Sequence, residues 1–132
     1  MNKLVSNEQL RGQTLPEQSQ VFQWIEYGER EITPVSNTLV YPCMGILQFN
    51  RNNNERAKDE LKHILQLLDN YLRTRTYLVG ERITLADITI ACDLLLLFQW
   101  VRDHLRESVY HACYRLLNKV FVIHIQILHD GF

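Results

Sequence analysis

A turn and a strongly specified helix start are encoded by Leu78-Val79-Gly80-Glu81-Arg82-Ile83-Thr84-Leu85-Ala86-Asp87-Ile88-Thr89. Thr84 is placed as the N-cap, because its hydroxyl can accept the backbone N–H of the residue three positions later. Asp87 can reach back to the Thr84 N–H, which completes a capping box with Asp in place of the usual Glu or Gln. Ile83 and Ile88 can close a hydrophobic staple over the same turn. These four residues predict a structural site at the start of a helix.

The helix that follows, over residues 85–100, is apolar on nearly every face. Such a pattern is typical of a buried helix, so we expect this helix to form the centre of the core. Asp87, Asp93 and Gln99 interrupt the apolar run. The run therefore falls short of the roughly 20 apolar residues that span a bilayer, and we expect no membrane insertion.

Length and composition describe a single domain of 132 residues, 46% of them hydrophobic. The 14 Lys and Arg residues against 15 Asp and Glu residues give a net charge of −1. This balance argues against direct binding of nucleic acid, which needs a large basic surface. The N-terminus has no apolar segment typical of a secretory signal, and Cys43, Cys92 and Cys113 form no CxxC pair. We therefore expect a cytoplasmic protein with reduced, mostly buried thiols.

Another amphipathic helix is predicted near the N-terminus. Residues 16–32 carry apolar side chains at helical spacing, with Thr14 as a nearby cap and Pro34 ending the helix. The apolar segment 35–49 contains Pro42 and a glycine, which favour an irregular or kinked connection across the core. The chain is thus expected to leave regular helix between residue 34 and the next polar segment.

The clearest periodicity in the chain covers residues 55–73. One face of this predicted helix carries the apolar residues Ala57, Leu61, Ile64, Leu65, Leu68 and Leu72. The polar segment before it, 50–54, predicts a loop in which Asn53 or Asn54 caps the helix. This helix is expected to bury its apolar face against the rest of the domain.

The segments divide the chain into a linker or arm over 1–14, a helical domain over 15–118 and a diverged tail over 119–132. A weaker helical pattern covers 104–118. Residues 120–128 are rich in β-branched and aromatic side chains, which favours a β segment. We expect an all-α bundle with a β-prone tail.

The five histidines do not form a recognisable metal site. They are His63, His104, His111, His124 and His129. The spacing His111-x-Cys113 matches no common zinc pattern, which takes paired ligands from two places in the chain. We therefore expect neither a metal nor a cofactor, and we expect His63 to lie in solvent.

The carboxylates of the central helix do not suggest acid–base catalysis either. Asp87 and Asp93 lie six residues apart, which places them on different faces of one helix, so they cannot converge on one substrate. Asp93 on an apolar helix needs a partner, which Arg102 or Lys119 could supply.

Several segments resemble a known family. The stretch Leu68-Asp69-x-Tyr71-Leu72-x-Thr74-Arg75-Thr76-x-Leu78-Val79-Gly80-Glu81-Arg82-x-Thr84-Leu85-Ala86-Asp87-Ile88-Thr89 is similar to the C-terminal helical domain of glutathione transferases. Further segments resemble, more narrowly, the transferase-like region of the translation elongation factor 1-gamma family: Ser6-Asn7-Glu8-Gln9-Leu10-Arg11-Gly12, Gln20-Val21-x-Gln23-Trp24-Ile25 and Tyr41-Pro42-x-x-Gly45-Ile46. Together they cover residues 6–103.

The resemblance implies an all-α fold, a helical bundle like the glutathione transferase C-terminal domain. It also implies a non-catalytic scaffold of the elongation factor 1 complex. Such a scaffold would hold nucleotide-exchange subunits of the beta and alpha type by helix-on-helix contact, through exposed parts of 16–32 and 55–73. Because the thioredoxin-like domain that carries the glutathione site of transferases is not matched, we expect no enzymatic activity.

Three alternatives stay open at this point. The first is a transferase-type enzyme half that works with a separate thioredoxin-like domain. The second is a truncated, non-functional paralogue, suggested by the unmatched domain and the β-prone tail. The third alternative concerns partners, because self-association could replace binding to the exchange subunits.

Overall fold

The computed structural model describes residues 7–104, and every regular element in this range is helical. In chain order the elements are α1 (Asn7–Arg11), α2 (Leu15–Tyr27), the π-helical turn η1 (Gly28–Ile32), α3 (Thr33–Val40), α4 (Arg51–Leu72) and α5 (Leu85–His104). The all-α prediction is confirmed for this part of the chain. The helix expected over 104–118, apart from its first residue, and the β-prone segment over 120–128 lie outside the described residues.

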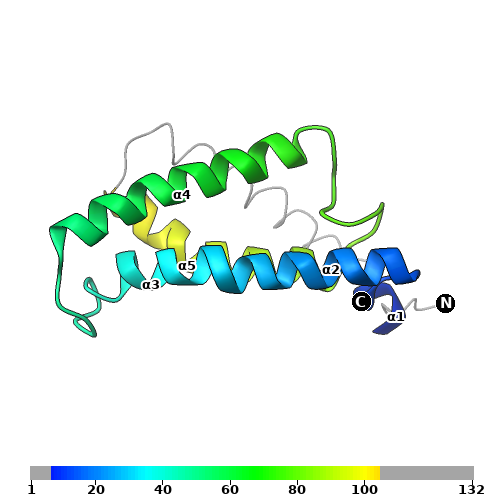
Figure 1. The fold of residues 1–132 in the computed structure, drawn as a ribbon, viewed down its shortest axis with the longest axis horizontal. Coiled ribbons are helices and arrows are strands. Elements are labelled where there is room, and N and C mark those ends of the chain that lie inside the picture. Colours follow the sequence, from blue (N-terminus) through cyan, green and yellow to red (C-terminus); the bar gives the residue numbers. More distant parts are fainter. Residues whose placement is uncertain (1–6, 105–132) are drawn as a thin grey trace.

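A long rod made of α2, η1 and α3 organises the bundle. These three elements follow one another without a break, and Figure 1 shows α4 lying alongside the rod at an oblique angle and α5 running behind the rod. The rod contacts α5 through all three of its elements and contacts α4 through α3 and η1. The short α1, inside the segment expected as a linker or arm, packs on α2.

The prediction that Pro34 ends the first long helix is wrong. The chain stays helical through Pro34, because η1 widens the helix just before it. The N–H of Thr33 bonds the carbonyl of Gly28, five residues back, as in a π-helix. Pro34 therefore falls in the first turn of α3, where a missing N–H and a fixed φ are tolerated.

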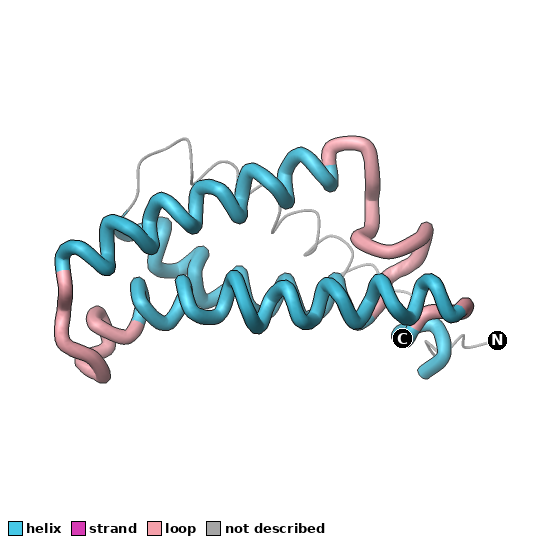
Figure 2. The backbone as a smooth tube through the Cα atoms, viewed as in Figure 1, coloured by secondary structure: helices cyan, strands magenta, loops and turns pink. Residues whose placement is uncertain are grey.

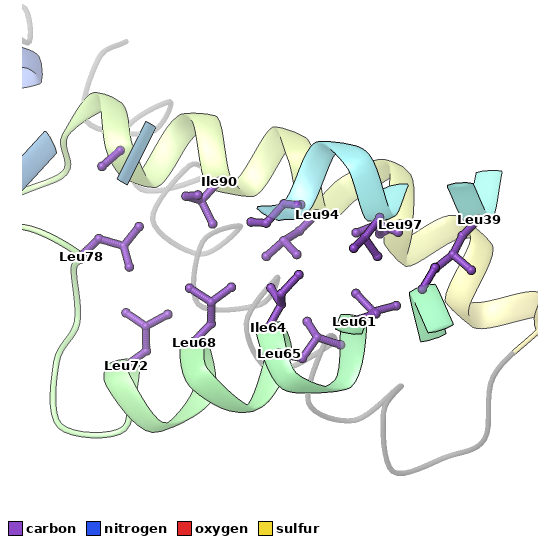
Figure 3. Close-up of a cluster of buried hydrophobic side chains, with 14 of the residues drawn as sticks. Leu39, Leu61, Ile64, Leu65, Leu68, Leu72, Leu78, Ile90, Leu94 and Leu97 are labelled. Atoms are coloured by element: carbon purple, nitrogen blue, oxygen red, sulfur yellow. The ribbon is translucent and has the colours of Figure 1, made fainter. Parts of the chain in front are cut away.

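The hydrophobic core fills the space between α4, the rod and α5. The apolar face of α4 is buried as predicted, with Ala57, Leu61, Ile64, Leu65, Leu68 and Leu72 all in the core. Figure 3 shows the leucines and the isoleucine of this α4 face pointing toward Ile90, Leu94 and Leu97 of α5 and toward Leu39 of α3. The loop after α4 adds Leu78 and Val79 to the same cluster.

The expectation that the central helix is buried on every face is wrong for the residues described. Ala86, Ile90, Leu94 and Leu97 of α5 are buried. The opposite side exposes other apolar side chains, namely Leu85, Cys92, Leu95 and Leu96. Within residues 7–104, α5 packs closely on the three elements of the rod and shares the core with α4, so these elements cover only one side of it. None of the described helices combines the length and apolarity needed to cross a bilayer.

The helix caps agree only in part with the sequence analysis. Thr14 caps α2 as predicted, since its hydroxyl accepts the N–H of Glu17 at 3.4 Å. The cap of α4 is Asn50, whose side-chain oxygen accepts the N–H groups of Asn52 and Asn53 at 3.1 and 3.2 Å. The helix therefore starts earlier than expected, and Asn53 and Asn54 lie inside it. Several asparagines in a row make this start ambiguous from sequence, because each is a good cap.

Two neighbouring leucines of α4 give a direct test of this core. Leu68 is 0% exposed and Leu67 is 48% exposed. Leu68→Ala should lower the free energy of unfolding by about 2–5 kcal/mol, because it leaves a cavity in a packed interior. Leu67→Ala should change it by less than about 1 kcal/mol. Urea denaturation of both variants measures the difference, and equal costs would contradict the placement of α4.

Candidate functional site

The site predicted from sequence lies in the turn that leads into α5, and its centre is a buried carboxylate. Asp87 is 3% exposed and accepts three hydrogen bonds from residues before the helix. The backbone N–H of Leu78 donates to Oδ1 at 3.0 Å, and the backbone N–H of Thr84 donates to Oδ2 at 3.0 Å. The Thr84 hydroxyl also donates to Oδ2, at 3.3 Å. One side chain thus fastens two separate points of the preceding loop to the first turn of α5.

Thr84 plays a different part from the one its position suggests. Its backbone N–H meets Asp87, as in a capping box, but its hydroxyl is directed at the same carboxylate. The N–H of Asp87 bonds the backbone carbonyl of Thr84 at 3.1 Å instead of the hydroxyl. A carboxylate that needs donors competes for the Thr84 hydroxyl, and a buried charge gains more from that bond than a neutral N–H does.

Burial and hydrogen bonding act on Asp87 in opposite directions. Burial raises the pKa of this carboxyl group, and the N–H donors of Leu78 and Thr84 partly offset that rise. Three hydrogen bonds hold the Asp87 carboxylate in place. Without it, the buried N–H groups of Leu78 and Thr84 would have no acceptor, which is energetically costly. The arrangement is therefore a structural clamp with a titratable centre.

The two isoleucines of the predicted staple flank this clamp. Ile83, directly before Thr84, is buried, and Ile88, in the first turn of α5, is half-buried. Gly80 precedes them in a left-handed conformation with φ of 63°, which relieves the turn at low cost. The chain therefore reverses direction just before the clamp.

An aromatic cluster that was not identified from the sequence supports the same loop from the other side. The Tyr71 hydroxyl at the end of α4 donates to the carbonyl of Leu78 at 2.8 Å. The Tyr71 ring meets Trp24 of α2 edge to face, with centroids 5.0 Å apart, and carries the Arg75 guanidinium 4.2 Å from its centre. The Arg75 guanidinium also donates to the Tyr71 hydroxyl. Helical spacing shows that these aromatics face inward, but it does not show that they meet.

Asp93, the other carboxylate singled out from sequence, packs against the rod. A side-chain carbon on Gly28 of η1 would lie only 2.7 Å from Asp93 Oδ2, so the glycine permits this close approach. Burial and the nearby Glu29 both raise the pKa of Asp93. Within the described residues Asp93 makes no ion pair. The side chain of Arg102 and all of Lys119, its expected partners, lie outside the described part.

The thiols and the described histidine stand apart from this site. Cys43 and Cys92 are exposed thiols, so the expectation of mostly buried thiols is wrong for these two, and Cys113 lies outside the described residues. His63 is exposed on α4, as expected. Asp87 and Asp93 lie on different parts of α5 with separate surroundings. Residues 7–104 contain no group of three or more His, Cys, Asp or Glu side chains that could hold a metal ion.

The clamp predicts unequal costs for its two polar residues. Asp87→Ala leaves the buried N–H groups of Leu78 and Thr84 without an acceptor, so it should lower the free energy of unfolding by about 2–4 kcal/mol. Thr84→Ala removes one of several donors and should cost only about 0.5–1 kcal/mol. Chemical denaturation measures both, with Asp59→Ala on the exposed face of α4 as a control expected to stay within about 0.5 kcal/mol. Equal costs at Thr84 and Asp87 would refute the clamp.

Asp93 predicts a dependence of stability on pH. Because its pKa is raised above the ordinary value of 3.8, the unfolded chain ionises first as pH increases. The free energy of unfolding therefore falls between that value and the folded-state pKa, and the loss persists at pH 7. Asp93→Asn should raise the free energy of unfolding at pH 7, and this gain should vanish as pH falls below about 3.8.

Denaturation curves at several pH values test this expectation. Asp59→Asn is a suitable control, because the Asp59 side chain is 75% exposed and its ion pair with Lys62 is a surface contact of little energetic weight. A gain for Asp93→Asn that is the same at every pH would contradict the electrostatic explanation.

Comparison with known proteins assigns this arrangement to a family. The family model described as the C-terminal domain of glutathione S-transferase matches residues 32–122. The match continues past residue 103, where the resemblance stated from the sequence ends. The family resemblance therefore extends beyond the described residues.

Similar proteins are elongation factor 1-gamma chains. That of Homo sapiens is 52% identical over 99 residues, which are 75% of this chain and 23% of the relative. That of Sus scrofa is 50% identical over 99 residues, with the same shares. That of Artemia salina is 46% identical over 118 residues, or 89% of this chain and 26% of the relative.

The chain spans about a quarter of the length of these relatives. Helices α3, α4 and α5 and the clamp before α5 fall within the matched residues 32–122, whereas α1 and α2 precede them. The chain belongs to the glutathione S-transferase C-terminal domain family and is, within it, a homologue of elongation factor 1-gamma.

Proposed function

We propose that the chain is a non-catalytic interaction domain of an elongation factor 1 complex in the cytoplasm, where it holds the nucleotide-exchange subunits. The observation that carries this proposal is the identity of about one half to elongation factor 1-gamma over three quarters or more of the chain. Binding is direct between proteins, without nucleic acid or membrane, in keeping with the net charge of −1.

The use of polar groups in the described core supports a structural role. The buried polar residues there are Ser36, Thr84 and Asp87. Thr84 and Asp87 bond each other and the loop, so their hydrogen-bonding capacity serves the fold. Catalytic groups instead need to point toward a substrate with some of that capacity free.

The exposed surface supports protein–protein contact. Ten large hydrophobic side chains of the described residues are exposed, and they occur on α2, α4, α5 and the loop between α3 and α4. Exposed apolar side chains that gather in one patch often mark a surface that contacts another protein.

A transferase-type enzyme half is the second candidate, and the family of the matching model favours it. In that case the helical domain would contribute an apolar wall to a substrate site completed by a separate thioredoxin-like domain. The two candidates differ in ligand: the enzyme half would bind glutathione or its conjugates together with that domain, and the scaffold would bind exchange subunits alone.

Co-expression of the tagged chain with the exchange subunits tests the proposal. We expect a complex of fixed stoichiometry that elutes as one species in size-exclusion chromatography. Calorimetric titration of the chain with glutathione should show no binding. The Leu68→Ala variant, which weakens the core and leaves the surface unchanged, is a control for nonspecific capture of partly unfolded chains.

Different results would select the alternatives. A folded, monodisperse chain that forms no complex with the exchange subunits would refute the scaffold. Glutathione binding would favour the enzyme half. A chain that is recovered only as aggregates, with or without the subunits, would favour a non-functional paralogue.

A further inference from the structure

The loop between α3 and α4, residues 41–50, concentrates exposed apolar side chains at one end of the bundle. Its large hydrophobic residues are 54–64% exposed: Met44 60%, Ile46 59%, Leu47 54% and Phe49 64%. No residue between Ile32 and Asn50 carries a formal charge. Figures 1 and 2 show this loop as a lobe at the end of the rod that lies away from α1. We call residues 41–50 the α3–α4 loop.

Hydrogen bonds hold the α3–α4 loop in one shape. The N–H of Met44 donates to the carbonyls of Val40 and Tyr41, each at 3.1 Å, and the N–H of Ile46 donates to that of Tyr41 at 3.0 Å. Gly45 takes a φ of 73°, which lets the chain reverse between Met44 and Ile46. A loop that is ordered before binding loses less conformational entropy when it meets a partner.

The size of this patch indicates what kind of partner it fits. A large side chain has roughly 200 Å² of surface, so the four exposed residues present on the order of 500 Å² of mainly apolar area. That is near the upper end for the largest patch of a typical monomer, about 300–600 Å². A stable interface takes about 800 Å² from each partner. Two copies meeting loop to loop would fall short, so the partner must also cover neighbouring residues.

The neighbouring residues are basic. Arg51 and Arg56, in the first turns of α4, are both exposed. The ion pairs along α4 join Lys58 to Glu55, Lys62 to Asp59 and Arg73 to Asp69, so within the described residues these two arginines take part in none. A positive side chain is unfavourable beside a helix N-terminus, and carboxylates supplied by a partner would offset that cost.

We propose that the α3–α4 loop is the centre of the surface that holds an exchange subunit, and that the bound segment of that subunit has an apolar face bordered by carboxylates. The inference rests on the proposed function and names its contact site. The exposed face of α4 beyond its first turns is less suited to an apolar contact, because it carries solvated ion pairs such as Lys58–Glu55 and Lys62–Asp59. The loop therefore replaces the helix faces as the expected centre of binding.

The first experiment removes the apolar side chains of the loop. The variant Met44→Ser/Ile46→Ser/Leu47→Ser/Phe49→Ser should weaken binding to the purified exchange subunit at least about tenfold, measured by calorimetry or interferometry. The control Phe22→Ser/Leu67→Ser changes two similarly exposed apolar residues elsewhere, and it should stay within about twofold of the original affinity. Circular dichroism establishes that each variant keeps its helices.

The second experiment tests the basic border without touching the loop. Arg51→Glu/Arg56→Glu should slow association with the exchange subunit about tenfold at low salt, and the difference should shrink at high salt. Lys62→Glu, further along the exposed face of α4, is the matched control and should have little effect. This variant keeps the inference testable if the loop variant does not fold.

The outcomes separate the inference from the proposed function. If the unchanged chain binds the exchange subunit and both sets of variants bind equally well, the inference is wrong and the scaffold stands. If the unchanged chain does not bind, the scaffold and the inference fall together. Loop-dependent dimerisation in sedimentation analysis, or loop-dependent binding to phosphatidylserine vesicles without any effect on the subunit, would also overturn it.

Discussion

One peptide unit, that of Leu78, is held from two helices at once. Its N–H donates to Asp87 at the start of α5, and its carbonyl accepts from Tyr71 at the end of α4. The Leu78 side chain meanwhile lies in the core. Both α4 and α5 pack mainly on the rod. The Leu78 peptide unit therefore links the end of α4 directly to the start of α5 through hydrogen bonds and fixes the directions of the two helices at the loop. The edge-to-face contact between Trp24 and Tyr71 connects this end of α4 to α2.

Stability and the proposed binding are located at opposite ends of α4. The clamp and the aromatic cluster gather at its C-terminal end, whereas the apolar α3–α4 loop and its arginines lie at the N-terminal end (Figure 2). A rigid helix between the two ends keeps the loop in place without using loop side chains for the core. Residues that bind a partner can therefore differ between relatives at small cost to the fold.

The sequence predicted best what depends on short-range periodicity. The buried face of α4 follows from spacing alone, and so does the cap at Thr14. The prediction failed where a distant contact decides. Pro34 is accommodated because η1 widens the turn before it, and the Thr84 hydroxyl is drawn to a carboxylate that also holds Leu78, nine residues before it. The exposure of the loop could not be predicted, because apolar residues usually signal burial and only the path of the chain shows which ones remain uncovered.

The π-helical turn η1 affects how the rod, with its regular spacing of apolar residues, packs on both α4 and α5. Apolar or small residues recur along the rod every seven residues, as at Val21, Gly28 and Val35. A π turn takes in one residue more than an α turn, and each α-helical residue rotates the side chains by about 100°. The rod packs on α5 through α2, η1 and α3, and on α4 mainly through η1 and α3. Gly28–Ile32 therefore sets how α3 is rotated relative to α2. A single-residue insertion or deletion there would rotate α3 by about 100° and change which of its side chains face the neighbouring helices.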